Sequence, residues 1–460
     1  MGGAGGAGGA GGAGGAGGAG GPGSGGSGGR CLVLLMRKQL RFRSFDHIQA
    51  LLDLAIDIHL VTVQSPDVAD DDPRFASILR VPTGSPDADV LAAVLEVGRL
   101  TGARAVITFA EVDIVIAGAA NEKLGVEWAC NGADRISRDK ARQREFLDNH
   151  GIASVWHYPV TDVGSAVAVA AAREPGLPLI VKPTRAASSS HVELVTDLDR
   201  LAAALTQIES LAKSKSRSYY DEMPRHWALL EEYLPGREVT LDAVVLDGEF
   251  ILGGICGKLV SPGPFFEEDL YTFPFDAPFD APESEAELVG LAASITGRLG
   301  VGSTLFNAEF RQDADGRFAV IEFSTRISGG HVYRNIKDVH GIDLVRMFAR
   351  RACGDKASDI VRQENRRSAP RMTTCNKVIF ATGTVVRNSA GETVHSPHFR
   401  AYYPMARPGE RVAAAPAGFD TVGTLSVRTT WKPGQPPAQV HAIAHDLTAQ
   451  LDIEVRPDPS

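Results

Sequence analysis

The sequence has few cysteines, no excess of positive charge and no long apolar run. The apolar segment Cys31–Met36 is far shorter than the roughly 20 residues that cross a membrane, and no signal-peptide cleavage pattern follows it. A net charge of −9 gives no basic footprint for a nucleic-acid partner. Five cysteines, odd in number and without CxxC pairs, favour free thiols over a disulfide framework. These absences predict a cytoplasmic protein with no membrane or nucleic-acid partner.

The composition of the chain is that of a globular protein with more than one core. It has 460 residues, of which 44% are hydrophobic and 22% are charged, enough for about two or three cores of ordinary size. Residues 1–30 are a glycine- and alanine-rich tail that cannot build a core. Three folded units are expected after it, at 31–134, 135–355 and 356–460.

The first unit alternates apolar strands with amphipathic helices. Strands are expected at Cys31–Met36, 58–63 and 104–109, with helices at about 44–56 and 87–100. This rhythm predicts a parallel sheet wound as βαβ units. No GxGxxG sequence follows the first strand, so the dinucleotide-binding fingerprint is absent.

The rest of the chain mixes helices with strands that are expected to pair in antiparallel fashion. Ser137 is the expected N-cap of a charged helix that runs to about Asn149. Further elements are a strand at 178–182, helices near 197–213 and 283–299, a hairpin-like unit at 227–257, and β segments at 377–386 and 421–430. The fold class is therefore a combination of α/β and α+β.

The most informative segment is the predicted hairpin 306–326. Asp315-Gly316 is the preferred pair of a two-residue type I′ turn, and both flanks alternate. That turn places Glu309 directly opposite Glu322, with Cβ atoms within about 5.5 Å of each other. Two facing carboxylates are unfavourable unless one is protonated or a cation lies between them. Such oxygen ligands suit Mg²⁺.

An ordinary solvated hairpin face is the alternative interpretation of this pair. Against it, the same face would also carry Asn307, Arg311, Ser324 and Arg326, while its flanks are strongly apolar. Polar side chains gathered on one face of a well-covered sheet favour a site over a free edge.

Two lysines and one hinge are ambiguous when taken alone. Lys182 ends an apolar strand and can either snorkel to water or meet a phosphate. Lys140, at the start of a helix, is open in the same way. The small, hydroxyl-rich turn 184–190 can offer N–H groups to a phosphate. The segment Ala228–Asp242 has the sequence of a plain β-hairpin, although a strand followed by an acidic hinge can also hold a purine.

In this order the segments resemble the ATP-grasp superfamily over about residues 31–460. The motifs that carry the resemblance are Lys140, Val181-Lys-Pro183, Glu231-Glu-Tyr-Leu234 with Gly236 and Glu238, Asn307-x-Glu309, and Glu322-x-Ser324-x-Arg326 with Gly329-Gly330. Within the superfamily the chain is most similar to the L-amino-acid ligases, which join a carboxylate to an amine. The resemblance implies an N-terminal βαβ domain, an ATP-grasp domain with a lid at about 178–257 and a central antiparallel sheet, and a β-rich C-terminal segment that completes the site.

The resemblance also implies a role for each motif. Arg326 would be catalytic, and Glu309 and Glu322 would bind the metal. The residues that would bind ATP are Lys140, Lys182, Ser188, Ser189, Glu231, Glu232, Tyr233, Leu234, Glu238 and Asn307. The residues that would bind the substrate carboxylate are Ser328, Gly329, Gly330 and His331. His331 could instead accept a proton or be purely structural. The implied cofactors are ATP and one or two Mg²⁺ ions, with Mn²⁺ as an alternative, and a homodimer stays open.

Two departures from the superfamily pattern stand out. The phosphate turn Arg185–Ser190 has no glycine, and Ser324 occupies a position where asparagine is common. Two other functions remain open: another ATP-grasp ligase, of purine-biosynthetic or carboxylase type, and a catalytically silent nucleotide-binding module. A carboxylase would need a biotin carrier, and no Met-Lys-Met-like biotinyl site is present.

Overall fold

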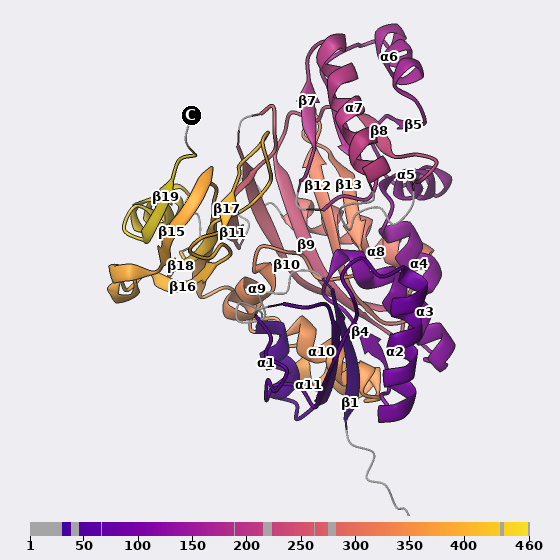
Figure 1. The fold of residues 1–460 in the computed structure, drawn as a ribbon, viewed down its shortest axis with the longest axis vertical. Helices are drawn as coiled ribbons and strands as arrows, with labels where there is room; N and C mark the ends of the chain where they lie inside the picture. Colours follow the sequence, from indigo (N-terminus) through magenta and orange to yellow (C-terminus); the bar gives the residue numbers. More distant parts are fainter. Residues whose placement is uncertain are drawn as a thin grey trace, which may run out of the picture.

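The computed structural model describes residues 30–37, 46–65, 67–187, 189–214, 223–261, 263–274, 282–432 and 437–458. The expected N-terminal tail lies outside this part except for Arg30. Figure 1 shows the N-terminal unit at the bottom, a small sheet with two helices at the top, and the C-terminal strands at the left, around one long central sheet. In the described part of the chain, no helix is both long and apolar enough to cross a membrane.

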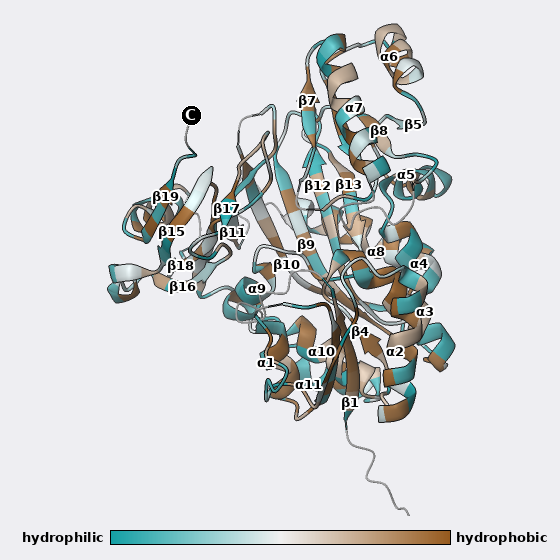
Figure 2. Ribbon diagram, in the orientation of Figure 1, coloured by the Kyte–Doolittle hydropathy of each residue, from teal (hydrophilic) through white to brown (hydrophobic). Residues whose placement is uncertain are grey.

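The N-terminal unit is the predicted parallel sheet. Its strand order is β3-β2-β1-β4, with every pair parallel. The strands are β1 (Cys31–Met36), β2 (Asp57–Thr62), β3 (Ser77–Arg80) and β4 (Val106–Ile107). All six residues of β1 are buried, as expected for a parallel strand covered on both faces, and the strand is brown in Figure 2. The helices of this unit are α1 (Asp46–Leu52), α2 (Asp87–Thr101) and α3 (Ile114–Leu124), and a 3₁₀ turn, Glu111–Asp113, precedes α3.

Two short helices connect this unit to the rest, where one helix was predicted. They are α4 (Asn131–Ser137) and α5 (Lys140–Asn149). The expected N-cap at Ser137 is wrong, since Ser137 ends α4 and Asp139 caps α5 by accepting from the N–H groups of Ala141 and Arg142. An aspartate beside the N-terminus also complements the helix dipole.

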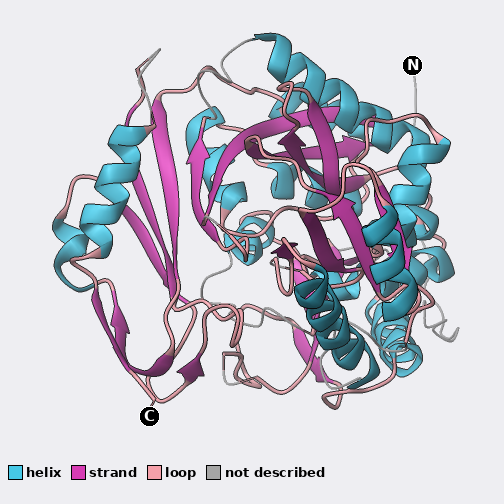
Figure 3. Cartoon of the chain, turned by 90° about the horizontal axis from the view of Figure 1, so that it is seen from above, coloured by secondary structure: helices cyan, strands magenta, loops and turns pink. Residues whose placement is uncertain are grey.

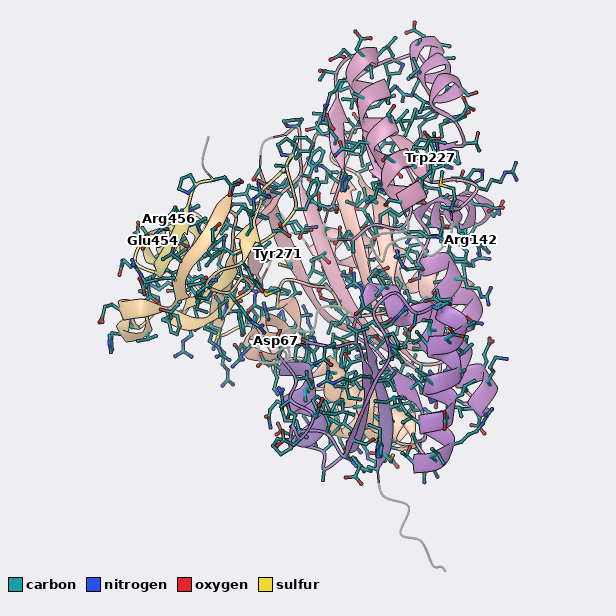
Figure 4. The ribbon with its side chains drawn as sticks, in the orientation of Figure 1. Asp67, Arg142, Trp227, Tyr271, Glu454 and Arg456 are labelled. Atoms are coloured by element: carbon teal, nitrogen blue, oxygen red, sulfur yellow. The ribbon has the colours of Figure 1, made fainter. Side chains whose placement is uncertain are left out.

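A four-stranded antiparallel sheet, order β5-β8-β6-β7, forms the upper unit. Its strands are β5 (His157–Val160), β6 (Leu179–Pro183), β7 (Glu193–Val195) and β8 (Ala228–Glu232). The helices α6 (Val163–Ala172) and α7 (Leu198–Ser214) cover it around a core that includes Trp227 (Figure 4). The hairpin expected at 228–242 is wrong, because β8 pairs within this sheet and the next strand belongs to another.

The central sheet has eight antiparallel strands in the order β13-β12-β9-β10-β11-β14-β18-β16. The strands are β9 (Glu238–Leu246), β10 (Glu249–Val260), β11 (Glu268–Phe273), β12 (Thr304–Gln312), β13 (Phe318–Ser324), β14 (Met372–Ile379), β16 (Phe399–Pro404) and β18 (Gly423–Thr430). Strands from before and after residue 355, the expected boundary between the second and third units, pair in this one sheet. Figure 3 shows its strands crossing the molecule from above.

Both faces of the central sheet are covered, which is why β9 is buried at all nine positions. Leu241 and Ala243 pack on α8 (Pro282–Leu299), whereas Val244 and Leu246 join the core that contains α9 (Val332–His340), α10 (Leu344–Ala352) and β1. The second of these cores connects the central sheet to the N-terminal unit. The short helix α11 (Ala357–Glu364) packs against α10.

A small sheet, order β17-β15-β19, lies at the C-terminal end. Its strands are β15 (Gly383–Ser389), β17 (Arg411–Val412) and β19 (Asp452–Arg456), and α12 (Ala438–Thr448) packs on β14 and β18. Glu454 and Arg456 mark this sheet at the left of Figure 4. The C-terminal segment is thus β-rich, as predicted.

The β12–β13 turn differs from the predicted one. Beyond the Gln312–Phe318 pair, the Asp313 amide donates to the Arg317 carbonyl at 2.9 Å, the Gly316 amide donates to the Asp313 carbonyl, and Gly316 has φ +82°, so the turn has three residues rather than two. A β-bulge then leaves Ile321 without a partner on β12. Because the extra turn residue and the bulge offset each other, Glu309 still pairs with Glu322, as predicted.

The bulge also creates the contact that fixes α5. Arg144, 1% exposed, donates to the carbonyls of Val320 (2.9 Å) and Ile321 (2.6 Å) and to Glu231 of the upper sheet (2.7 Å). One side chain therefore ties α5, β8 and β13 together.

We expect Arg144→Leu to lower the free energy of unfolding by about 3 kcal/mol, because it leaves a buried carboxylate and two carbonyls with fewer donors. Chemical denaturation measures this change. Arg142→Leu, on the same helix but exposed at the edge of the molecule (Figure 4), is the matched control. Equal losses in the two variants would contradict the role given to Arg144.

Candidate functional site

A pocket of about 1010 Å³ lies between the upper sheet and the central sheet. It gathers every predicted ATP-binding, metal-binding and catalytic residue that the structure describes. These are Lys140, Lys182, Ser189, Glu231, Glu232, Tyr233, Leu234, Glu238, Asn307, Glu309, Glu322 and Arg326. Ser188 lies outside the described residues. We call it the nucleotide pocket, after the ATP-binding residues predicted for it.

The facing glutamates each contact a different lysine. Glu322 forms an ion pair with Lys140 at 2.8 Å, and Glu309 forms one with Lys258 at 3.2 Å. Burial raises the pKa of Glu309 to about 7, against the opposing effect of Lys258, and the neighbouring carboxylates add to the rise. Burial is the main reason that this carboxyl resists ionisation, and a cation bound beside it would favour its charged form.

Lys258, which belongs to no motif identified in the sequence, lies at the centre of three carboxylates. Its ammonium group is 2.6 Å from Glu238, 2.9 Å from Glu268 and 3.2 Å from Glu309. Although burial opposes its ionisation, these carboxylates raise the pKa of Lys258 well above its usual value. Lys258 therefore stays protonated and keeps the acidic side chains of β9, β11 and β12 together.

A second buried ion cluster lies on the upper sheet. Glu231 is bonded to Arg144 and, at 2.7 Å, to Lys182, whose ammonium also donates to the carbonyl of Ile321 at 3.1 Å. Burial disfavours ionised Glu231, but Arg144 and Lys182 outweigh it and lower its pKa to about 2. Burial, only partly offset by Glu231, lowers the pKa of Lys182 to about 8. The carboxylate of Glu231 thus holds the lysine that points into the pocket.

Tyr233, in the hinge after β8, and Phe266, in the loop before β11, form an aromatic wall. The guanidinium of Arg311 lies 5.6 Å from the ring centre of Tyr233 and 5.2 Å from that of Phe266, within cation–π range. Arg311 also bonds Glu238 at 3.1 Å. A flat apolar slot beside a carboxylate suits a base and its ribose.

Arg326 is oriented by a residue of the N-terminal unit, Glu111, which the sequence also did not indicate. The Arg326 Nε atom donates to the Glu111 carboxylate, which also accepts from Ser324 at 3.1 Å. Burial opposes ionised Glu111, yet Arg326, Arg138 and Lys140 together keep its pKa below the usual value. Glu111 therefore fixes the arginine although it lies 215 residues away in sequence.

A second pocket, of about 1180 Å³, adjoins the first, and Arg326, Ser189, Phe266 and Glu268 line both. All four predicted substrate-binding residues, Ser328, Gly329, Gly330 and His331, line it. Ser328 is anchored by its amide, which donates to Asp242 at 2.8 Å. The C-terminal residues Val378, Phe380, Met405, Phe419, Thr421 and Thr424 complete the wall. We call it the second pocket.

His331 stacks on Tyr403 with ring centres 3.6 Å apart, and its backbone has φ +59°. Burial lowers its pKa to about 4. A stacked, half-buried imidazole has the surroundings of a structural residue, and such a low pKa makes it a weak proton acceptor.

The chemistry of the facing glutamates fits a magnesium ion that is shared with a phosphate. Among the described residues, no group of three or more His, Cys, Asp and Glu side chains could hold a metal by itself. Mg²⁺ usually takes one or two carboxylates together with substrate phosphates and water. Glu309 and Glu322 supply that number of ligands.

The chain matches a known domain family over part of its length. Residues 176–334 match the ATP-grasp domain family. The chain is 27% identical over 289 residues to the alanine–anticapsin ligase of Bacillus subtilis (strain 168), which covers 60% of this chain and 59% of that enzyme. The match thus spans about three-fifths of the length of this relative.

Two solved structures share the fold. An L-amino acid ligase from Bacillus licheniformis has a TM-score of 0.76 at 18% identity, covering 93% of this chain and 99% of that one. The biotin carboxylase domain of 2-oxoglutarate carboxylase from Hydrogenobacter thermophilus, in complex with MgADP, ADP and bicarbonate, has a TM-score of 0.66 at 18% identity, covering 93% and 91%. The architecture is that of ATP-grasp structures.

The raised pKa of Glu309 predicts how stability depends on pH in the absence of metal. A carboxyl group whose pKa is about 7 when folded and near 4.5 when unfolded favours folding at low pH, and this contribution is lost as pH rises through 7. Glu309→Gln should therefore melt at a higher temperature than the parent at pH 8, with a smaller difference at pH 5.

Melting curves at both pH values, in a chelator, measure this effect. Glu249→Gln, at an exposed position on β10, should change neither curve. A Glu309→Gln protein that is less stable than the parent at pH 8 would contradict the charge crowding described above.

Proposed function

Because this chain carries an ATP-grasp domain and is similar to amino-acid ligases, we propose that it is an ATP-dependent carboxylate–amine ligase. It would join an amino acid to an amine through an acyl phosphate and release ADP and phosphate. The observation that carries the proposal is the position of Arg326, which lines both the nucleotide pocket and the second pocket. A group at this junction can contact both a terminal phosphate and a carboxylate.

The chemistry needs such a junction because a carboxylate is a poor electrophile. Transfer of the γ-phosphoryl group to a carboxylate oxygen gives an acyl phosphate and ADP. The amine nitrogen then attacks the carbonyl carbon, the bond from that carbon to the phosphate oxygen breaks, and the nitrogen loses a proton as phosphate leaves. Catalysis is mostly positioning and charge stabilisation.

The side chains of the nucleotide pocket can be assigned to the base, the ribose and the phosphates of ATP. Tyr233, Leu234 and Phe266 form the apolar slot for the base, and Glu238 lies where ribose hydroxyls would be held. Lys140 and Lys182 bring positive charge toward the phosphates, and Ser189 lies in the turn 184–190 that would contact them. Arg326 stabilises the negative charge that develops on the transferred phosphate and on the carbonyl oxygen.

Glu309 and Glu322 would hold the magnesium ion. When bound, the ion supplies charge neutralisation to the phosphate oxygens. Release of Lys140 from Glu322 would then free its ammonium group for the nucleotide, while Lys258 would stay paired with Glu238 and Glu268. Ser324, whose hydroxyl bonds Glu111, is engaged elsewhere, which supports one well-formed metal position beside this pair.

The alternatives are less well supported. A silent nucleotide-binding module would have no need for Lys140, Lys182, Glu309, Glu322 and Arg326 to meet at one pocket, and they do. A purine-biosynthetic or carboxylase-type ligase shares the nucleotide pocket but joins its carboxylate to a ribose-linked or biotin nitrogen rather than to a free amino acid. Its substrate dependence therefore separates it from an amino-acid ligase.

We expect ADP release to rise about tenfold or more when pools of amino acids are added with ATP and Mg²⁺, because the acyl acceptor completes the reaction. A coupled assay of ADP, with mass spectrometry of the products, measures this. No dependence on any amino-acid pool would contradict the proposal.

Glu322→Gln should lower this turnover on the order of 100-fold, because the metal loses a charged ligand. Titration with Mn²⁺ should show weaker metal binding in the same variant. Glu249→Gln, exposed and remote from the pocket, serves as control. Near-normal turnover in Glu322→Gln would remove the metal assignment.

Glu111→Gln should lower kcat about tenfold through the loss of a charged partner of Arg326, with little change in KM for ATP. Combining it with Arg326→Lys should cost less than the sum of the two single changes, since both act through one guanidinium. Glu127→Gln, exposed in the same unit, is the control. Fully additive losses would show that Glu111 acts independently of Arg326.

A further inference from the structure

The second pocket has one polar end and one apolar end. The polar end is the junction with the nucleotide pocket, where Arg326 and Glu268 lie. The apolar residues Phe109, Val378, Phe380, Met405 and Phe419, from the N-terminal unit and the C-terminal segment, line much of the remainder, together with Glu267, Thr421 and Thr424. Tyr271, at the centre of Figure 4, lies on the strand that separates these C-terminal strands from β10.

The polar end is arranged for the two charges of an amino acid. Arg326 offers a guanidinium to a carboxylate. The Glu268 carboxylate, which accepts from Lys258 and from the Tyr271 hydroxyl, offers its negative charge to an ammonium group. Because the carboxylate to be activated must meet the phosphate at this junction, the side chain of that amino acid extends toward the apolar end.

The apolar end offers little to a charged side chain. Among the described residues that line the second pocket, the charged ones are Arg326, Glu267 and Glu268. Glu267 accepts a hydrogen bond from the Ala415 amide at 3.0 Å. The two histidines in the wall are neutral at pH 7, because burial lowers the pKa of His47 to about 3 and that of His331 to about 4.

The floor of the pocket lacks side chains where it meets Tyr271. Gly330 has φ +64°, and a Cβ atom there would lie 2.9 Å from the Tyr271 ring. Gly329 precedes it in the same wall. The missing Cβ at Gly330 lets the Tyr271 ring pack against the backbone, whereas a Cβ at Gly329 would meet no atom within 4 Å, so the wall at Gly329 leaves room for a large side chain.

We propose that the second pocket selects an amino acid with a large apolar side chain, aromatic or branched aliphatic, and disfavours charged side chains. This assignment rests on the proposed function for the identity of the polar end. The side chain lies among Phe380, Met405 and Phe419, while Arg326 holds the carboxylate.

Equilibrium binding tests the assignment without needing turnover. Calorimetry of the full chain with Mg²⁺ and a non-hydrolysable ATP analogue should show phenylalanine and leucine binding about tenfold or more tightly than lysine or aspartate, since burying such side chains is favourable. Equal affinities, tighter binding of lysine through Glu267, or no binding by any of the four would overturn it.

Two variants locate the side-chain site. Phe380→Ala should weaken phenylalanine binding about tenfold, whereas Phe399→Ala, which packs against α12 away from both pockets, should not. Met405→Lys should weaken phenylalanine and strengthen aspartate, reversing their order. Unchanged selectivity in both Phe380→Ala and Met405→Lys would overturn the placement.

The outcome also separates this assignment from the proposed function. Selective binding of phenylalanine and leucine without any ADP release would leave the pocket assignment standing and sink the ligase proposal. Amino-acid-dependent ADP release with lysine or aspartate preferred would do the reverse.

Discussion

The rest of the structure depends on Lys258, the buried cation that offsets the repulsion between the carboxylates gathered around it. Glu238, Glu268 and Glu309 converge on its ammonium group within 3.2 Å, and Glu322 faces Glu309 from the next strand. A sheet buried on both faces would not tolerate this concentration of negative charge without the lysines. The arrangement keeps oxygen ligands together for a divalent ion, and binding of that ion would relieve the repulsion between the carboxylates.

The units around this centre orient positively charged side chains toward the nucleotide pocket. Arg144 connects α5 to the bulged strand β13 and to Glu231, and Glu231 holds Lys182. From the other side, Glu111 of the N-terminal unit orients Arg326. Each cation that points into the nucleotide pocket is thus held by a buried carboxylate or a backbone carbonyl from another element. Such supports keep side chains in place before a ligand binds, which lowers the cost of ordering them.

Features that depend on contacts close in sequence could be predicted, whereas features that depend on contacts between distant segments could not. The facing glutamates were predictable, although the three-residue turn and the bulge at Ile321 altered the register twice and restored it by offsetting each other. The position of Lys258 was not predictable. A regular hairpin around Asp247-Gly248 pairs Lys258 with Arg237, and only the irregularity at Gly253 shifts its partner to Glu238. Glu111 and Asp242 reach the site through tertiary packing that no local pattern encodes. The parallel sheet was predictable from its alternation, whereas the separation of β8 from β9 into two sheets was not, because the sequence between them has the form of an ordinary turn.

The central claim is that a carboxylate oxygen becomes bonded to phosphorus at the junction of the two pockets. Isotope transfer tests this most directly: an amino-acid substrate whose carboxylate carries ¹⁸O in both oxygens is turned over with ATP, and the released phosphate is analysed by mass spectrometry. The account predicts one ¹⁸O atom in each phosphate that is released during ligation. Released phosphate without ¹⁸O, in the presence of amide product, would contradict the acyl phosphate and the arrangement of the site built around it.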